Sequence, residues 1–246
     1  QVKKVFIDES ILSSVKKEVA LRKKLQKTPF FATILADKLS KKPYSYTETL
    51  CTGRTIPYKG ITNYLALATQ VLTIFQPLYK DTKTVTVETY LKQITQRIEK
   101  TLTQSETLRS KHEEITSFVN QVKKSLKFPN KKITLVRTHG DFIIPNVTII
   151  KGKIILLDWD LSDYRSTFFD VWTFYFNTHF HYNTYSLSKK ELSLLFKLKY
   201  KNTKNDKNYL LLFMLERLLL ILENKGYNYE ERIRKRLNNW IGMYEE

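Results

Sequence analysis

The sequence has few of the residues that several kinds of site require. Cys51 is the only cysteine among 246 residues, so no disulfide can form within the chain and no cysteine-based zinc site is expected. The six glycines lie far apart, so no glycine-rich phosphate-binding loop exists in the sequence. The most apolar run, Tyr209–Leu222, is too short to span a bilayer and is broken by Glu216 and Arg217, which favours a core helix. No signal peptide is recognisable at the amino end, and we expect a cytoplasmic protein.

Acidic residues are also scarce relative to basic ones. The chain has 24 Asp and Glu against 42 Lys and Arg, which gives a formal net charge of +18. An excess of this size favours anionic partners such as nucleotides, nucleic acids, phosphorylated sugars or an acidic membrane surface. A lysine-rich composition inherited from a biased genome explains it equally well, so the charge alone selects no function. Apolar residues make up 42% of the chain, enough for one large domain or two small lobes.

Hydrophobic periodicity predicts an α+β protein with a β-rich amino-terminal part. Residues 1–8 are typical of a strand, and the amphipathic residues 10–25 predict a helix that begins with a serine cap. Two further strands are expected at residues 30–39 and 44–52. We therefore expect a small, partial lobe at residues 1–56, with the order strand, helix, strand, strand.

The remaining residues, 57–246, are predicted to form a larger, mostly helical lobe. One helix is expected at residues 62–79, and apolar residues at spacings of three and four within residues 85–126 predict two amphipathic helices or one long bent helix. A strand at residues 132–138 precedes a hairpin, and the chain after Asp170 is expected to be helical to its end, with a polar loop at residues 200–208. The predicted core positions of the central helices are Val87, Leu91, Ile94, Ile98, Leu102, Ile115, Phe118, Val122 and Leu126.

Acidic and amide side chains gather around this short hairpin. A His-Gly-Asp segment ending at Asp141 is followed by Asn146, and the apolar runs NVTII and KIILL then lead to Asp158. Gly152, between the two runs, suits the positive φ of a tight turn. Because a hairpin folds back on itself, we expect Asn146 and Asp158 to lie near each other at its open end, close to Asp141. Their hard oxygen atoms suit Mg²⁺, which prefers few protein ligands plus phosphates.

The order His-x-Asp-x-x-x-x-Asn, followed by a short hairpin and the sequence Asp-Trp-Asp, resembles the aminoglycoside phosphotransferase and choline kinase group. This group is a small-molecule branch of the protein-kinase-like fold. The resemblance implies that Asp141 is the catalytic base and that Asn146 and Asp158 are the Mg²⁺ ligands. It also implies that His139 is structural and that Asp170 braces the catalytic loop. Turn and strand-end roles explain each of these residues singly, but not their common order.

The resemblance extends more weakly to the amino-terminal part. In this fold, a strand lysine holds the nucleotide phosphates and pairs with a helix glutamate. Lys3 or Lys4 on the first strand and Glu18 on the first helix have the order and spacing for these roles, with ATP as the implied phosphate donor. The segment TETLCTGRTI resembles the link between the lobes that receives adenine. Each lysine taken alone is as easily a solvated surface residue.

The sequence departs from this family in its phosphate-covering loop. The strands and the loop that should precede the lysine strand are missing, so we expect either a truncated sequence or a degenerate small lobe. This leaves a second function open, that of a nucleotide-binding pseudokinase or scaffold. A third, nucleic-acid binding, is suggested by the charge and the fifteen tyrosines, but lysine and arginine are scattered along the whole chain.

The phosphate acceptor is expected to be a small molecule. Only eleven residues separate Asp158 from Asp170, which is too few for a regulated peptide-binding segment. Gly140 also stands where protein kinases have the arginine that a phosphorylated segment engages. Because a protein with a charge of +18 attracts cations poorly at long range, a neutral or anionic hydroxyl acceptor such as a sugar is favoured.

The carboxyl-terminal segment, residues 231–246, has the pattern of a basic amphipathic helix. Its apolar face is expected either to pack on the large lobe, which is the commoner use of such a stripe, or to lie on an anionic membrane surface. The second alternative would place the protein at the inner face of the membrane. The apolar face consists of Ile233, Leu237, Trp240 and Tyr244, and the basic residues are Arg232, Arg234, Lys235 and Arg236.

Overall fold

Helices and strands both occur in the structure, as expected for an α+β protein. A computed structural model describes residues 2–6, 16, 18–21, 44–48, 54–55, 80–128, 130–150, 153–174 and 206–223. The chain splits into two compact units, which are Gln1–Asp81 with Val136–Tyr164 and Asp170–Lys199, and Thr82–Leu135 with Arg165–Phe169 and Tyr200–Glu246. The lobe boundary expected at residue 56 stays a prediction.

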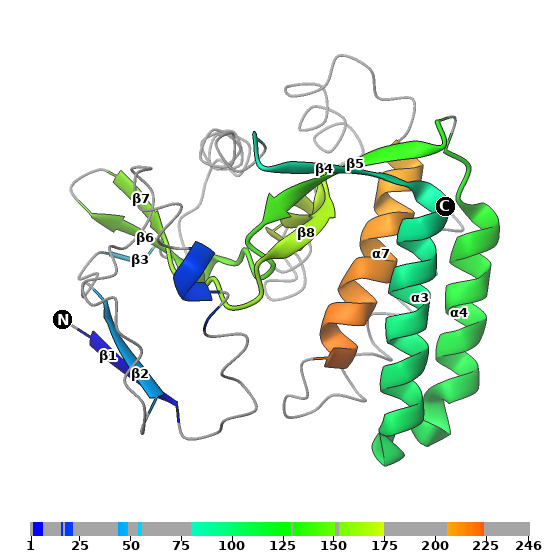
Figure 1. Cartoon of the computed structure of the whole chain (residues 1–246), viewed down its shortest axis with the longest axis horizontal. Coiled ribbons are helices and arrows are strands. Elements are labelled where there is room, and N and C mark those ends of the chain that lie inside the picture. Colours follow the sequence, from blue (N-terminus) through cyan, green and yellow to red (C-terminus); the bar gives the residue numbers. More distant parts are fainter. Residues whose placement is uncertain are drawn as a thin grey trace, which may run out of the picture. The chain divides into compact units, whose positions relative to one another are not determined.

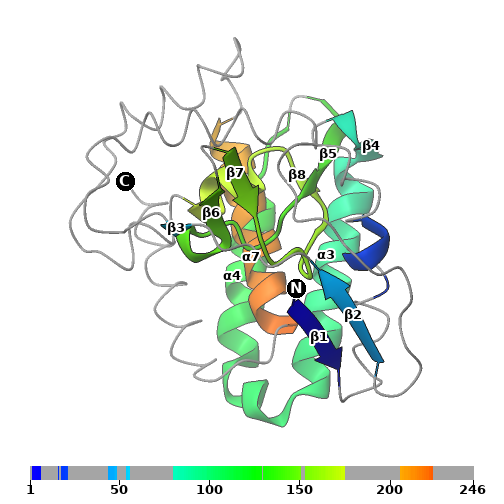
Figure 2. The same cartoon turned by 90° about the vertical axis from the view of Figure 1, so that its left-hand side faces the viewer.

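The first unit contains the amino-terminal strands. Strand β1 (Val2–Phe6) pairs antiparallel with β2 (Tyr44–Glu48), and the two lie side by side in Figure 2. Both strands were expected from the sequence. Residues 16 and 18–21 are helical and fall within the predicted amino-terminal helix. The strand predicted at residues 30–39 and the helix predicted at residues 62–79 lie outside the described residues.

The hairpin that the sequence predicts is present in the first unit. Strand β6 (Val147–Ile150) pairs antiparallel with β7 (Lys153–Leu156), and Ile150 lies opposite Lys153. The turn expected at Gly152, between these strands, lies outside the described residues. The short strand β3 (Arg54–Thr55) pairs with the other edge of β6 and completes a three-stranded sheet of order β3-β6-β7.

A second three-stranded sheet has the order β4-β5-β8. Strand β5 (Lys132–Thr138) matches the predicted strand and leads directly into the His-Gly-Asp segment. Strands β4 (Thr82–Thr86) and β8 (Asp163–Ser166) were not predicted. Both are short and mostly polar, so they carry little of the apolar alternation by which half-buried strands are recognised.

The first central helix begins two residues later than its apolar pattern suggests. Helix α3 (Val87–Gln104) starts after Thr86, whose side-chain hydroxyl accepts a hydrogen bond from the backbone N–H of Thr89 at 3.1 Å. This cap satisfies one of the backbone donors that the first helical turn leaves unpaired. Val85 therefore belongs to β4 and not to the helix.

Three helices pack side by side in the second unit, as Figure 1 shows. They are α3, α4 (His112–Ser125) and α7 (Asp206–Glu223), and the short 3-10 helix η3 (Glu106–Lys111) connects the first two. Two helices, rather than one bent helix, therefore fill the predicted region. The buried core positions of α3 and α4 are Tyr90, Ile94, Ile98, Leu102, Ile115, Phe118, Val119 and Val122.

Helix α7 is the core helix expected from the apolar run. Its residues 211–220 are all buried, which explains the absence of a polar face in its sequence. Glu216 and Arg217 are buried with their apolar neighbours. Within the described part of the chain, no helix is long and apolar enough to cross a membrane. The amphipathic segment at residues 231–246 lies outside the described residues.

Candidate active site

The register of the hairpin brings the predicted metal-binding residues to its open end. Val147 lies opposite Leu156, and the backbone N–H of Leu157 donates to the carbonyl oxygen of Asn146 at 2.9 Å. Asn146 therefore lies opposite Leu157, one residue before Asp158. The prediction that these two chain segments approach each other here is confirmed.

A tight turn carries Asn146 back onto Asp141. Residues Ile144–Asn146 form the 3-10 helix η4, in which the N–H of Asn146 donates to the carbonyl of Ile143 at 3.0 Å. The side-chain amide of Asn146 donates to the backbone oxygen of Asp141 at 2.9 Å and contacts its carboxylate at 3.4 Å. Pro145 favours this turn because its ring fixes φ near the 3-10 value. The four residues between the aspartate and the asparagine thus close a compact loop.

The His139 side chain stabilises this loop through hydrogen bonds between its ring and the backbone. Its ring is fully buried, and Nε2 lies 2.7 Å from the carbonyl oxygen of Leu157. Its Nδ1 atom accepts a hydrogen bond from the backbone N–H of Asp141 at 3.3 Å. Since a carbonyl oxygen can only accept, Nε2 must carry the proton and Nδ1 the lone pair. With both nitrogens bonded to the backbone, the ring is suited to a structural role and not to proton transfer.

Asp170 fixes the backbone just before the predicted base. One carboxylate oxygen accepts from the N–H of His139 at 2.7 Å, and the other accepts from the N–H of Gly140 at 3.0 Å. Asp170 is 1% exposed, so these charge-assisted hydrogen bonds are shielded from water. It lies in the first turn of the helical residues 169–174, where a negative charge is favourable. This geometry fits the bracing role that the family resemblance implies.

Gly140 has a steric reason to be glycine. Its φ is 95°, and a Cβ atom added there would lie 2.2 Å from the carbonyl oxygen of Leu161. No side chain fits at that distance, and the backbone conformation itself disfavours one. In the sequence, Gly140 stood out because protein kinases have an arginine at the corresponding position. The structure shows a separate reason for glycine, because Leu161 passes too close to leave room for a side chain.

Asp158 stands on a constrained turn after β7. It is exposed and has a φ of 61°, in the left-handed region that aspartate tolerates better than most residues. The next residue, Trp159, is buried, and its indole N–H donates to the carbonyl of Leu156 at 3.0 Å. The Trp159 ring lies 4.4 Å from the His139 ring between centroids. The buried tryptophan therefore anchors the turn that leaves Asp158 at the surface.

The chemistry of Asn146 and Asp158 fits a magnesium ion. The amide nitrogen of Asn146 is turned toward Asp141, so its oxygen is the atom suited to a cation. Together they offer one amide oxygen and one carboxylate, and Mg²⁺ usually takes one or two carboxylates and completes its shell with water and phosphates. In the described part of the chain, no three His, Cys, Asp or Glu side chains gather to hold a metal by themselves.

The predicted nucleotide-binding residues are placed only in part. Lys3 and Lys4 lie on β1, opposite Thr47 and Tyr46, but their side chains lie outside what the structure describes. Glu18 lies on the amino-terminal helical turn and is only 4% exposed. A carboxylate is rarely buried to this degree without a partner. The pairing of Glu18 with one of the lysines stays a prediction.

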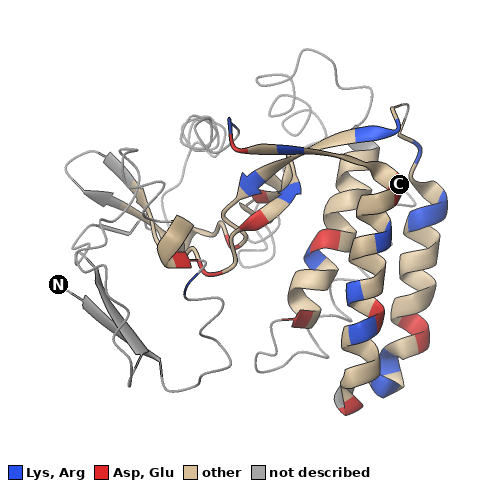
Figure 3. Ribbon diagram, in the orientation of Figure 1, with Lys and Arg blue, Asp and Glu red and all other residues tan. Residues whose placement is uncertain are grey.

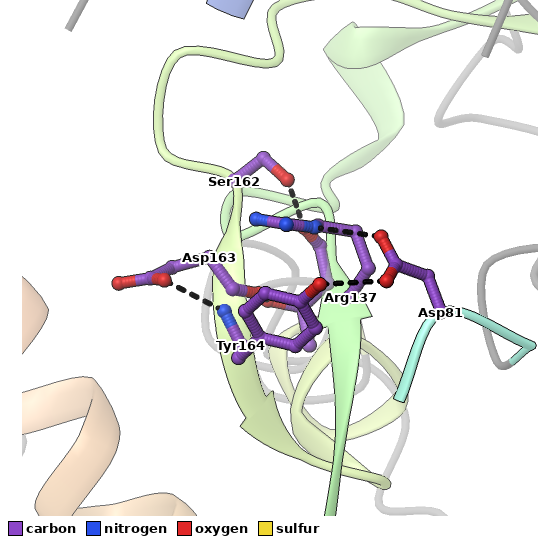
Figure 4. Close-up of polar contacts among 6 residues, drawn as sticks. Asp81, Arg137, Ser162, Asp163 and Tyr164 are labelled. Atoms are coloured by element: carbon purple, nitrogen blue, oxygen red, sulfur yellow. Dashed lines mark hydrogen bonds and ion pairs between the residues drawn. The ribbon is translucent and has the colours of Figure 1, made fainter. Parts of the chain in front are cut away.

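Two polar groups escaped the sequence analysis. In the first unit, Asp81, Arg137 and Tyr164 contact one another (Figure 4). In the second unit, the carboxylate of Glu216 is buried among hydrogen-bond donors, and it had been noted only as a break in an apolar run. Neither group shows a local sequence motif, because the partners come from segments far apart in the chain.

The Glu216 carboxylate accepts three hydrogen bonds. Its Oε1 lies 2.6 Å from both the Tyr90 hydroxyl and the backbone nitrogen of Ser166, and its Oε2 lies 2.6 Å from the Ser166 hydroxyl. Burial raises the pKa of Glu216 to about 7, although these hydrogen bonds and the nearby Arg165 act in the opposite direction. Through these hydrogen bonds, Glu216 links α7 to α3 and to β8 within the second unit.

Comparison with known proteins shows which family and fold the chain resembles. The sequence pattern of the ecdysteroid kinase-like family matches residues 65–184, which include the loop that carries Asp141 and the β6–β7 hairpin. No curated protein sequence matches the chain.

Solved structures of small-molecule kinases are similar to the whole chain. Ethanolamine kinase from Plasmodium vivax is 13% identical, with a TM-score of 0.68 over 97% of this chain and 74% of that one. Choline kinase from Cryptosporidium parvum Iowa II is 12% identical, with a TM-score of 0.60 over 98% and 78%. The streptomycin–ATP complex of APH(2″)-IIa is 12% identical, with a TM-score of 0.60 over 96% and 84%. The chain therefore has the protein-kinase-like fold of the choline kinase and aminoglycoside phosphotransferase group, as the sequence motifs predict.

Proposed function

We propose that the protein is an ATP- and Mg²⁺-dependent phosphotransferase that moves the γ-phosphoryl group to a hydroxyl of a small molecule. The observation that carries this proposal is the loop at the open end of the hairpin. There Asn146 contacts Asp141, Asp158 follows two residues after the end of the paired strand β7, and Asp170 holds the loop backbone. This combination of a base, two hard oxygen ligands and a brace serves phosphoryl transfer in proteins of this fold.

In the proposed reaction, Asp141 receives the proton of the acceptor hydroxyl. A bond forms between the acceptor oxygen and the γ-phosphorus as the bond to the bridging oxygen of ADP breaks, so the products are a phosphate ester and ADP. Asp141 is half-buried and its carboxylate is oriented by the amide of Asn146 at 3.4 Å. A positioned base of this kind contributes about 10²- to 10⁴-fold to a rate.

Asn146 and Asp158 would hold the magnesium ion, which neutralises charge on the transferring phosphoryl group when it is bound. In the same proposal, Lys3 or Lys4 contacts the phosphates of ATP, and Glu18 orients that lysine. The buried position of Glu18 supports this arrangement, because a carboxylate inside the protein needs a cation or hydrogen-bond donors.

The acceptor is proposed to be a small neutral or anionic hydroxyl compound, such as a sugar. The segment between Asp158 and Asp170 is short, and Trp159, Phe168 and Phe169 within it are buried. It therefore offers little chain for a peptide-binding platform. The net charge of +18 disfavours a cationic acceptor at long range.

A nucleotide-binding pseudokinase is the second candidate, because the sequence has no cluster of glycines to cover the phosphates. Nucleic-acid binding ranks below both. Acidic residues lie among the basic ones along α3, and α4 has acidic residues in its first turn and lysines in its last turn, so neither helix carries basic residues alone, as Figure 3 shows. Association with an anionic membrane surface through residues 231–246 stays a sequence prediction, and nothing in the described residues supports it.

The test is a phosphorylation assay with a panel of acceptors. The protein is incubated with ATP and Mg²⁺ and with neutral sugars, sugar phosphates, choline, ethanolamine or an aminoglycoside, and the acceptor mass is followed for the gain of a phosphoryl group. The Asp141→Asn variant is the control for contaminating kinases. Phosphorylation of a sugar supports the full proposal, and phosphorylation of a cation supports the chemistry but contradicts the acceptor class. Binding of ATP without transfer to any hydroxyl compound would favour the pseudokinase.

A further inference from the structure

A three-residue polar cluster lies in the first unit where the chain enters and leaves the candidate active site. Asp81 accepts a hydrogen bond from the Tyr164 hydroxyl at 2.6 Å, and its other carboxylate oxygen lies 3.4 Å from Nε of Arg137. The Arg137 guanidinium lies over the Tyr164 ring, 3.8 Å from its centroid. Figure 4 shows the Asp81 carboxylate facing both partners at once. Each of the three side chains therefore contacts the other two.

The cluster joins segments that the sequence keeps far apart. Arg137 lies near the end of β5, two residues before His139, and Tyr164 lies in β8, six residues after Asp158. Asp81 comes from more than fifty residues upstream, and its backbone carbonyl oxygen accepts a hydrogen bond from the backbone N–H of Arg137 at 3.0 Å. The strand that delivers the proposed base and the segment that follows the proposed metal ligand are thus tied to one anchoring residue.

Two hydrogen bonds from side-chain hydroxyl groups join the same two chain segments at a point closer to the candidate active site. The Ser162 hydroxyl donates to the carbonyl of Thr138 at 2.6 Å, and the Thr138 hydroxyl donates to the carbonyl of Asp163 at 2.9 Å. Thr138 is fully buried, so its bonds are sheltered from water. Only Asp81 among these groups belongs to neither segment. Its carboxylate therefore contacts one side chain from each segment, Arg137 and Tyr164.

We propose that Asp81 is a positioning residue, which acts through Arg137 and Tyr164 to hold the catalytic loop and the segment after Asp158 in register. This inference rests on the proposed function. In this proposal the segment after Asp158 has one fixed conformation, whereas the corresponding segment of regulated protein kinases moves.

The physical chemistry of the cluster suits a permanent lock. Asp81 and Arg137 are each about one-fifth exposed or less, so their ion pair is screened less than a surface pair. The stacking of a guanidinium on a tyrosine ring adds a contact whose strength does not depend on a single hydrogen bond. Burial and the hydrogen bond to Asp81 raise the pKa of Tyr164. The hydroxyl therefore stays a donor throughout the neutral pH range.

The test compares Asp81→Ala, Tyr164→Phe and the double variant with the wild type. Glu99→Ala is the control, because Glu99 is an exposed carboxylate on α3 that contacts His112 at 3.1 Å and no member of the cluster. Two readouts are used. Hydrogen exchange of the backbone amides at residues 138–146 needs no substrate, and the steady-state rate is measured on whichever acceptor the wild type phosphorylates.

A positioning role predicts that Asp81→Ala speeds exchange at residues 138–146 and lowers kcat, each by about tenfold, with the KM for ATP within about twofold. Exchange in α7 and the behaviour of Glu99→Ala should match the wild type. Tyr164→Phe, which removes only one oxygen atom, should act in the same direction. The double variant should be no worse than Asp81→Ala, because both changes break one interaction.

Unchanged loop exchange and kcat in Asp81→Ala would overturn the inference. Equal acceleration of exchange in α7 would also overturn it, because the effect would then be general destabilisation. If Asp81→Ala fails to fold, Tyr164→Phe decides alone by the same criteria. If the wild type phosphorylates no acceptor, the proposed function fails, whereas loop exchange still decides whether Asp81 positions the loop.

Discussion

The carboxylate of Asp170 accepts the backbone N–H of His139, 31 residues earlier in the chain, at 2.7 Å. The same carboxylate accepts the N–H of Gly140 at 3.0 Å, so one buried side chain fixes two consecutive peptide groups ahead of Asp141. A carboxylate needs donors when it is buried, and the turn needs acceptors for its N–H groups. The brace and the loop therefore stabilise each other.

Asp170→Asn should weaken both the fold and the proposed activity. An asparagine offers one acceptor oxygen, and its NH₂ group would face one of the two N–H donors. The loss of a charge-assisted bond and the unsatisfied donor predict a decrease of about 3 kcal/mol in the free energy of unfolding, measured by urea denaturation. The kcat should fall at least about tenfold, because the base loses its fixed backbone.

Glu223→Gln is the control for Asp170→Asn, because it removes a carboxylate that forms an ion pair with Arg97 at 2.6 Å on the surface. A surface pair is worth at most about 1 kcal/mol, so this variant should remain close to the wild type. Equal stability of the Asp170→Asn and Glu223→Gln variants would show that the brace has no special role.

Gly140→Ala should be strongly destabilising. The new methyl group would lie 2.2 Å from the carbonyl oxygen of Leu161, and the φ of 95° is unfavourable for alanine. Backbone or loop movement must relieve this contact, at a cost of about 2 kcal/mol or more. Thermal unfolding of the variant measures the cost. A melting temperature equal to that of the wild type would show that Leu161 does not pass so close to the loop.

Glu216 should make stability depend on pH. Its pKa is raised to about 7 in the folded state, from an ordinary value of 4.5, because it is buried. The folded state therefore binds the proton more tightly than the unfolded state. The resulting stabilisation is fully present below pH 4.5 and is lost as the pH rises through 7, by about 3 kcal/mol in total.

Glu216→Gln should remove this dependence. A glutamine resembles the protonated acid, since its oxygen can accept from Tyr90 and from the backbone N–H of Ser166 while its NH₂ donates to the Ser166 hydroxyl. Unfolding free energies are measured for both proteins from pH 5 to pH 8. We expect the variant to gain stability relative to the wild type across this range. Parallel curves would mean that Glu216 does not titrate there.

Asp158, and not the nearby Asp163, is predicted to bind the Mg²⁺ ion that accompanies ATP. ATP affinity is measured by calorimetry with and without Mg²⁺, in the wild type, in Asp158→Ala and in the control Asp163→Ala. Mg²⁺ should tighten ATP binding in the wild type and the control, and Asp158→Ala should lose this increase, because one of two protein ligands is gone. An equal response of all three proteins to Mg²⁺ would place the ion elsewhere.

The sequence predicted the parts of the site that are local. Asp141, Asn146 and Asp158 lie within one loop and one hairpin, and a short turn together with the pairing of β6 and β7 brings their segments together. The two amphipathic helices were visible for the same reason, because periodicity is a local signal. The role of Asp170 could be expected only from the family pattern, since its contact with His139 joins distant segments.

The sequence did not reveal the features that depend on tertiary contacts. Strands β4 and β8 are short and polar, and they form because neighbouring β5 supplies partners for their backbone groups. Asp81 and Glu216 have no motif around them, and their meaning appears only when Arg137, Tyr164, Tyr90 and Ser166 are placed beside them. The requirement for glycine at position 140 likewise depends on Leu161, which passes over it.

The measurement that tests the proposed chemistry most directly is the turnover of Asp141→Asn. Asparagine has the same shape and can still contact Asn146, so the variant should unfold at the wild-type temperature and bind ATP with Mg²⁺ within about twofold of the wild type. Because the amide cannot take the acceptor proton, kcat should fall by about 10²- to 10⁴-fold. A folded Asp141→Asn variant that phosphorylates the wild-type acceptor at an unchanged rate would contradict the assignment of Asp141 as the base.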